Sequence, residues 1–113
     1  MQTQQFPGEY EISTDTHRLH VEVIHNFLAE ESYWSPGIPR GIVERAIQNS
    51  LRFGVYHCTA QVGFACVVTD KSTFALLADL FILIAHRGKG LSKWLMRCVV
   101  GHEDLQGPRR LLP

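Results

Sequence analysis

Residues 73–100 read TFALLADLFILIAHRGKGLSKWLMRCVV and predict a strand, a glycine turn and a helix in direct succession. The stretch from Thr73 to Ile84 is almost entirely apolar, which is typical of a buried strand. Beyond the turn, apolar residues recur at the i, i+3, i+4, i+7 and i+8 spacing of an amphipathic helix, and Gly101 is expected to end it. The members of this stripe are Leu91, Trp94, Leu95, Cys98 and Val99.

Two further strands are predicted upstream, over Val55–Thr59 and Val62–Thr69. The polar breaks between the three strands are only two or three residues long. Parallel neighbours need a crossover of a dozen or more residues, so the three strands are expected to form an antiparallel meander.

Two amphipathic helices are predicted before the meander. The first is expected from about Thr16, with Asp15 as its N-cap. The second follows Pro39, continues through Leu51 and is expected to stop at Gly54. At the other end of the chain, residues 109–113 resemble the beginning of a fourth strand.

The composition predicts one domain over residues 1–113, because 113 residues and 12.8 kDa suit a single core. Eleven basic residues balance eleven acidic ones, so no overall field attracts nucleic acid or an anionic membrane, and we expect neither partner. The chain carries no apolar run long enough to cross a bilayer. Cys58, Cys66 and Cys98 lie in apolar surroundings and are expected to be buried thiols of a cytoplasmic protein.

The glycine turn is the segment with a specific chemical interpretation. Glycines between a strand and a helix let the backbone approach a ligand, and the first-turn amides of the helix have no partners within it. With Arg87, Lys89 and Lys93 nearby, the turn favours a phosphate. A solvated basic turn is the alternative. The spacing excludes a Walker A loop, and Lys93 stands where a Rossmann turn would need its third glycine.

The turn Arg87-Gly88-Lys89-Gly90-Leu91-Ser92 resembles the phosphate loop R/Q-x-x-G-x-G/A of the GNAT superfamily of acyl-CoA-dependent N-acetyltransferases. The order of the predicted elements also resembles that family. Residues 32–40 and 86–96 are similar to a bacterial branch that acetylates small amines. The resemblance implies an α/β (α+β) fold, with a mixed, mostly antiparallel central sheet and flanking helices.

The resemblance also implies an activity: transfer of the acetyl group of acetyl-CoA to a primary amine of a small molecule or peptide. The amine would attack the thioester directly, with no covalent enzyme intermediate. The pyrophosphate of CoA would lie on the glycine turn, and the pantetheine arm would pair with the end of the long strand. The residues implied to bind acetyl-CoA are Phe81, Ile82, Leu83, Arg87, Gly88, Lys89, Gly90, Leu91, Ser92 and Lys93.

The sequence departs from the family in two respects. Ser92 stands where glycine or alanine is usual. Family members also continue beyond the position of Leu112 with a completed strand, a helix and a hairpin, so we expect a C-terminally incomplete domain that self-associates through an uncovered sheet edge. The alternative function is a noncatalytic CoA-binding or interaction module.

A few other polar and aromatic residues are candidates for the catalytic and acceptor sites. Asp79 interrupts the apolar strand and could be a general base or an anchor of the acceptor site, or equally a structural carboxylate at a bulge or strand edge. Tyr33 and Trp34 could bind an amine, although ordinary packing is the more frequent role of such residues. No metal site is predicted. His57 and Cys58 are adjacent and, as strand neighbours, would point to opposite faces.

Overall fold

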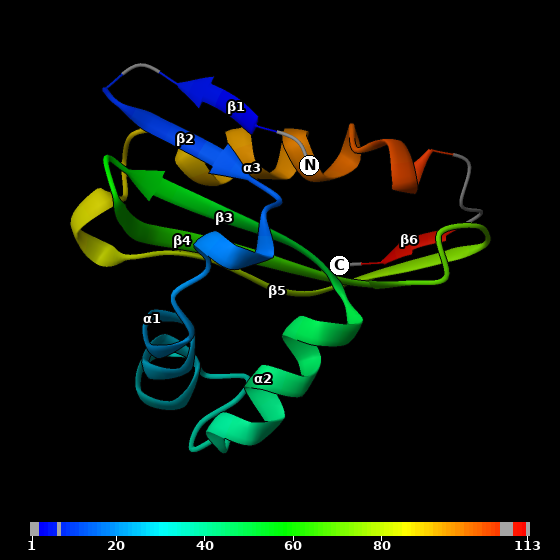
Figure 1. Cartoon of the computed structure of the whole chain (residues 1–113), viewed down its shortest axis with the longest axis horizontal. Helices are drawn as coiled ribbons and strands as arrows, with labels where there is room; N and C mark the ends of the chain where they lie inside the picture. The colour runs from blue at the N-terminus through cyan, green and yellow to red at the C-terminus, as the bar shows by residue number, and fades with distance from the viewer. Residues whose placement is uncertain (1–2, 7, 107–109, 113) are drawn as a thin grey trace.

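Six strands form one sheet in the computed structural model, which describes residues 3–6, 8–106 and 110–112 (Figure 1). The strands lie in chain order across the sheet, and every neighbouring pair is antiparallel except the last, which is parallel. The antiparallel meander predicted from the loop lengths and the mixed, mostly antiparallel sheet implied by the resemblance are therefore confirmed. The strands are β1 (Thr3–Phe6), β2 (Tyr10–Ser13), β3 (Leu51–His57), β4 (Ala60–Thr69), β5 (Phe74–Ile82) and β6 (Arg110–Leu112).

Helices cover both faces of the sheet. Figure 1 shows α1 (Val21–Asn26) and α2 (Arg40–Asn49) on one face and α3 (Leu91–Val100) on the other. A π-helical turn, Phe27–Glu31, continues α1. Within the described residues, no helix is both long enough and apolar enough to cross a membrane. Short 3-10 turns occupy Thr16–Arg18, Ile84–His86 and Glu103–Leu105.

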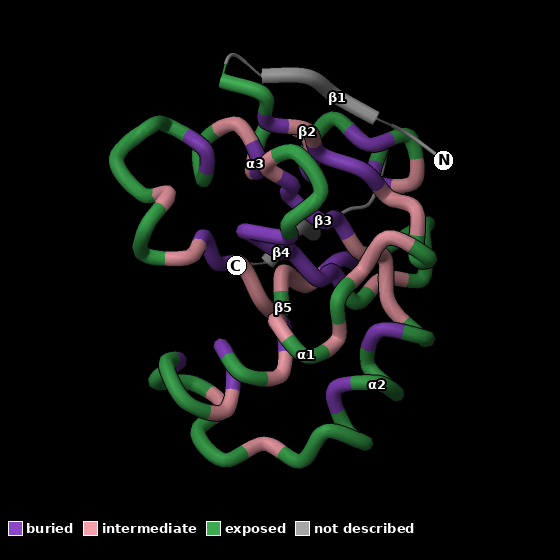
Figure 2. Tube along the Cα trace, turned by 60° about the vertical axis from the view of Figure 1, so that its left-hand side comes forward, coloured by how far each residue is buried: buried purple, intermediate pink, exposed green. Residues whose placement is uncertain are grey.

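The core consists of two layers, one on each face of the sheet. On the α3 face, Leu91, Leu95 and Val99 pack against buried residues of β3 such as Phe53 and Val55. This confirms the helical stripe predicted after the glycine turn. Figure 2 shows the buried residues concentrated on the central strands. On the opposite face, the second layer contains Ile24, Phe27, Leu28, Val43, Ile47, Phe64, Cys66 and Phe81.

A β-bulge divides β5. Asp79 pairs with Cys66 of β4, but the next pair joins Val67 to Leu77, which leaves Ala78 without a partner in the ladder. Because side chains alternate along a strand, one extra residue exchanges the faces. Asp79 and Phe81 therefore lie on the α1 and α2 side. A bulge or strand edge was the expected setting of Asp79 if its carboxylate is structural, and β5 has such a bulge.

The first helix begins later than predicted. Thr16–Arg18 form only a 3-10 turn, in which the Asp15 carboxylate accepts a hydrogen bond from the His17 amide at 3.0 Å. The backbone is then extended at His20, whose amide donates to the buried side chain of Gln61 in β4 at 2.7 Å. This bond to the sheet separates the turn from α1.

The boundary between α2 and β3 was also predicted wrongly. The helix ends at Asn49, and Leu51 already pairs with Val67 in the sheet. Gly54 is not a helix stop: it lies inside β3, where an added Cβ would overlap the Tyr56 hydroxyl. The glycine is needed there because the Tyr56 ring occupies the space that a side chain would fill.

The N-terminal hairpin of β1 and β2 was not predicted from the sequence. Tyr10 and Ile12 of β2 are buried in the α3-side layer.

The strand predicted to reach Thr59 ends at His57, because Cys58 takes a left-handed turn with a φ of 57°. Contrary to the prediction, the Cys58 thiol is exposed. The predicted fourth strand is present over Arg110–Leu112, while Arg109 and Pro113 lie outside the described residues.

Candidate functional site

The connection from β5 to α3 has an open backbone. The 3-10 turn of Ile84–His86 ends the strand, and both Gly88 and Gly90 follow with a φ of 81°. This left-handed region is costly for residues with a side chain. Among the described residues, no atom beyond the neighbouring backbone lies within 4 Å of where a Cβ would stand at either glycine, so there is space above the turn for a ligand.

A cavity of about 420 Å³ opens at this turn and at the start of α3. Gly90 is the N-cap of the helix, and no side chain caps it. The first-turn amides of a helix lack acceptors within the helix and carry its positive dipole end. Together with Arg87 and Lys93, the cavity suits an anion such as a pyrophosphate. Its lining residues are Ile82, His86, Arg87, Gly88, Gly90, Leu91, Ser92 and Lys93, and Lys89 is not among them.

The turn is fixed to the end of β5 by its own hydrogen bonds. Arg87 Nε donates to the Ile82 carbonyl at 2.8 Å. The Leu83 amide donates to Val62 of β4 at 2.8 Å, and the Leu83 carbonyl accepts from the His86 amide at 2.9 Å. Leu83 therefore has both backbone groups engaged, and of the three strand residues implied to meet pantetheine, Ile82 keeps an amide on the open side of β5.

A second cavity of about 420 Å³ adjoins the first along β5. The two cavities share Ile82, Arg87 and Ser92. The glycine turn is thereby brought together with Tyr33 and Trp34, two residues that were singled out from the sequence. The remaining residues that line the second cavity are Phe27, Glu31, Leu80 and Phe81.

Aromatic rings form one wall of the second cavity. Phe27 stacks on Phe81 with ring centroids 4.0 Å apart, and Trp34 lies 6.2 Å from Phe27. Tyr33 meets Trp34 edge to face and is 91% exposed, so its ring is free to contact a bound molecule.

Asp79 lies behind this wall and does not line the cavity. Its Oδ1 accepts a hydrogen bond from Trp34 Nε1 at 2.7 Å. Burial raises the pKa of the Asp79 carboxyl, and the bond from Trp34 partly opposes that shift. This geometry suits Asp79 to holding the indole of Trp34 in position.

Two titratable residues that line the cavities were missed by sequence reasoning. Glu31 lines the second cavity from the end of the π-helical turn, which closes through a bond of 2.9 Å from the Ser32 amide to the Phe27 carbonyl. His86, which lines the first cavity, accepts or donates a bond of 2.7 Å at Nδ1 with the Tyr10 hydroxyl from the unpredicted hairpin. Neither a π-helical turn nor a contact across 76 residues leaves a local signal in the sequence.

Comparison with known proteins gives a consistent result, although no family model matches the chain. A GNAT-family protein from Xanthomonas campestris pv. campestris is 46% identical, with a TM-score of 0.88 over 90% of this chain and 72% of that chain. A relative from Gibberella zeae, named as a candidate acetyltransferase, is 30% identical over 119 residues. That match covers 88% of this chain and 66% of the relative, so the chain spans just under two thirds of its length.

The fold alone is also similar to that of a GNAT family acetyltransferase from Elizabethkingia anophelis that has acetyl-CoA bound. The TM-score is 0.59 at 10% identity, over 81% of this chain and 56% of that chain. The closer relationship is the one to the Xanthomonas protein, in which nearly half of the aligned residues are the same. On its sequence, its sheet and its glycine turn, this chain belongs to the GNAT family of acetyltransferases.

Proposed function

We propose that this chain transfers the acetyl group of acetyl-CoA to an amine of a small molecule or peptide. The observation that carries the proposal is the pair of adjoining cavities, one at the glycine turn and one at the aromatic wall, which share Ile82, Arg87 and Ser92. A donor with a phosphate end and a reactive thioester end needs such a continuous path along β5.

The donor side would be held by backbone groups. Amides of the first turn of α3 would bind the pyrophosphate, since Gly88 and Gly90 leave the space above them open. Arg87 and Lys93 would add positive charge. The Ile82 amide, on the open side of β5, would pair with the pantetheine arm as an additional strand would.

The acceptor side would bind a cationic amine. Glu31 supplies a carboxylate at the second cavity, and the faces of Tyr33 and Trp34 can contact an ammonium group. The ammonium group loses one proton to water, the nitrogen of the resulting amine forms a bond to the thioester carbon, and the C–S bond breaks. The nitrogen loses a second proton in this step, and the departing thiolate takes up one proton to become the thiol.

Asp79 would act as a positioning residue for Trp34. Its carboxylate is bonded to the indole at 2.7 Å and does not line the acceptor cavity. Asp79→Ala should raise the KM for the amine while leaving the affinity for acetyl-CoA unchanged. Asp79→Asn retains an oxygen acceptor and should restore the KM. A loss of kcat in both variants, with KM unchanged, would instead mark Asp79 as the general base.

The donor site is tested by calorimetry with acetyl-CoA and a matched pair of variants. Gly90→Asp brings a negative charge to the turn at a φ of 81°, and Gly37→Asp brings the same charge to an equally open glycine with a φ of 70° in the α1–α2 connection. The backbone cost should be similar, but only Gly90→Asp should weaken acetyl-CoA binding, by at least about tenfold. Equal binding by both folded variants would overturn the donor site, and turnover with a panel of amines then tests transfer itself.

A further inference from the structure

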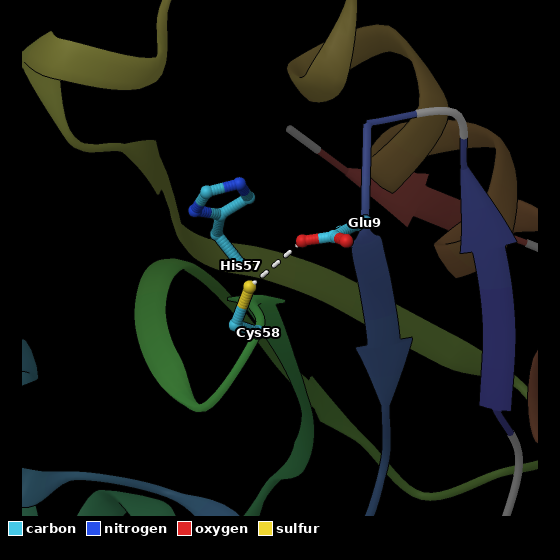
Figure 3. Close-up of side chains that lie close together, drawn as sticks. All are labelled: Glu9, His57 and Cys58. Carbon is cyan, nitrogen blue, oxygen red and sulfur yellow. Dashed lines mark hydrogen bonds between the residues drawn. The ribbon is translucent and has the colours of Figure 1, made fainter.

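Three potential metal ligands meet where two turns of the sheet lie side by side. Glu9 belongs to the turn between β1 and β2, and Cys58 to the turn between β3 and β4 (Figure 3). His57 ends β3 and pairs with Tyr10, the residue after Glu9. The ligand atoms of Glu9, His57 and Cys58 all lie within 4.8 Å of one another.

The two turns are fixed to each other independently of any ligand. The Cys58 amide donates to the Glu9 carbonyl at 3.2 Å, and the Cys58 thiol donates to Glu9 Oε2 at 3.1 Å. The backbone of this cluster therefore needs no rearrangement to keep the three side chains together.

The residue types are unusual for their backbone conformation. Glu9 has a φ of 66° and Cys58 a φ of 57°, and in the described part of the chain Lys71 is the only other non-glycine residue with a positive φ. Glycine would occupy both positions without a steric penalty. Each position instead carries a side chain with a metal-binding atom.

We propose that Glu9, His57 and Cys58 bind one zinc ion, or a divalent ion of similar preference. Carboxylate, imidazole and thiolate are all zinc ligands, and three protein ligands leave a fourth position for water. Ligand bonds of about 2.0 to 2.3 Å in a tetrahedron place the ligand atoms roughly 3.5 Å from one another. Side-chain rotations that move these atoms by about 1 Å from their present positions are therefore sufficient. The thiol selects against Mg²⁺ and Ca²⁺, which prefer oxygen ligands.

Charge balance is consistent with this ligand set. Binding replaces the thiol proton, which passes to solvent, and a thiolate and a carboxylate together neutralise a divalent ion. All three side chains are at least partly exposed, so the ion has a path from solvent. No oxidation or additional reactant is involved.

The proposed zinc site lies beside the glycine turn. The His57 ring is 4.7 Å from the Tyr10 ring and 5.4 Å from the His86 ring, centroid to centroid. Tyr10 is in turn bonded to His86, which lines the cavity at the turn. A bound ion would fix His57 against these two rings and join the N-terminal hairpin to the region that precedes α3.

The test is titration of the reduced full chain with Co²⁺, followed by displacement with Zn²⁺. We expect one equivalent of cobalt to produce visible bands of a tetrahedral site and a thiolate-to-cobalt charge-transfer band, both removed by zinc. Glu9→Gly and Cys58→Gly delete ligands while relieving a left-handed backbone, so these variants should fold. Each should weaken zinc binding by at least about tenfold, and Cys58→Gly should abolish the charge-transfer band.

The matched control is Cys98→Ser, which removes a half-buried thiol on α3 and should leave the bands unchanged. Zinc should also raise the thermal midpoint of the native chain by more than that of Glu9→Gly at the same zinc concentration. The absence of a charge-transfer band from the native chain would overturn the proposal. So would a band that survives in Cys58→Gly and is lost in Cys98→Ser. Neither readout depends on acetyl-CoA or on turnover.

Discussion

Trp34 depends on a carboxylate that lies outside the acceptor cavity. Its indole donates to Asp79, and the bulge at Ala78 is what turns Asp79 toward the α1 and α2 face. A strand without the bulge would direct the carboxylate to the opposite face. The hydrogen bond of the Trp34 indole thus depends on the bulge at Ala78, one position before its acceptor Asp79.

Asp79 should make the stability of the fold depend on pH. Burial raises the pKa of its carboxyl in the folded state, so the protonated form is favoured there and stability falls as pH rises through the folded pKa. Asp79→Asn keeps an acceptor for Trp34 without the charge, and it should raise the thermal midpoint at pH 7. The advantage should shrink as pH falls toward about 4, the ordinary value for an aspartate. A difference that is constant with pH would contradict this account.

Tyr56 carries a buried hydroxyl without a hydrogen-bond partner in the described structure. Burial raises the pKa of this tyrosine to about 12, because the ionised form would be poorly solvated. Tyr56→Phe should therefore stabilise the protein by about 1 kcal/mol, since an unsatisfied buried polar group costs roughly that much or more. The ring remains in place beneath Arg18, whose guanidinium lies 4.2 Å from its centre. Urea unfolding measures the change, and a destabilised variant would reveal an unseen partner for the hydroxyl.

Helix α3 holds its first-turn amides in place through its buried stripe. Leu95 is 0% exposed at the centre of that stripe, and Leu95→Ala should cost about 2 to 5 kcal/mol through lost burial and a cavity. Val100→Ala, at a position that is 47% exposed on the same helix, should change stability by less than about 0.5 kcal/mol. Denaturant unfolding of the two variants compares them directly, and equal costs would show that the stripe does not anchor the helix.

The elements differ in how far the sequence predicts them. The strand, the glycine turn and α3 were predictable because a long apolar run is followed by a clear helical stripe. The end of α2 was not, because Leu51 continues the helical spacing from Ile47 and also begins the alternation of β3. The four-residue strand β2 offers too few alternations to detect. In the site, the glycine turn was predictable, whereas Glu31 and His86 take their roles from tertiary contacts.

At the scale of the whole molecule, the open edge of β5 predicts weak self-association. In the described part of the chain, β6 pairs only with residues 74–76, so residues 77–82 have a strand neighbour on one side alone. Such an edge can pair with another chain. Sedimentation at several concentrations should reveal dimers, and Ala78→Lys, with a charge at the exposed bulge, should reduce them. Ala46→Lys, at an exposed position of α2, is the matched control. A chain that stays monomeric throughout would show that the edge is protected.

The order of the strands across the sheet has a consequence for how the protein is made. Each strand neighbours the one synthesised before it, so a chain leaving the ribosome always presents a partner for the strand that follows. The longest delay is residues 14–50, which carry α1 and α2 and must emerge before β2 can meet β3. We expect the β3–β4–β5 meander, whose contacts are local, to form early. Strand β6 can pair with the edge of β5 only after α3 has been synthesised and has packed over one face of the sheet.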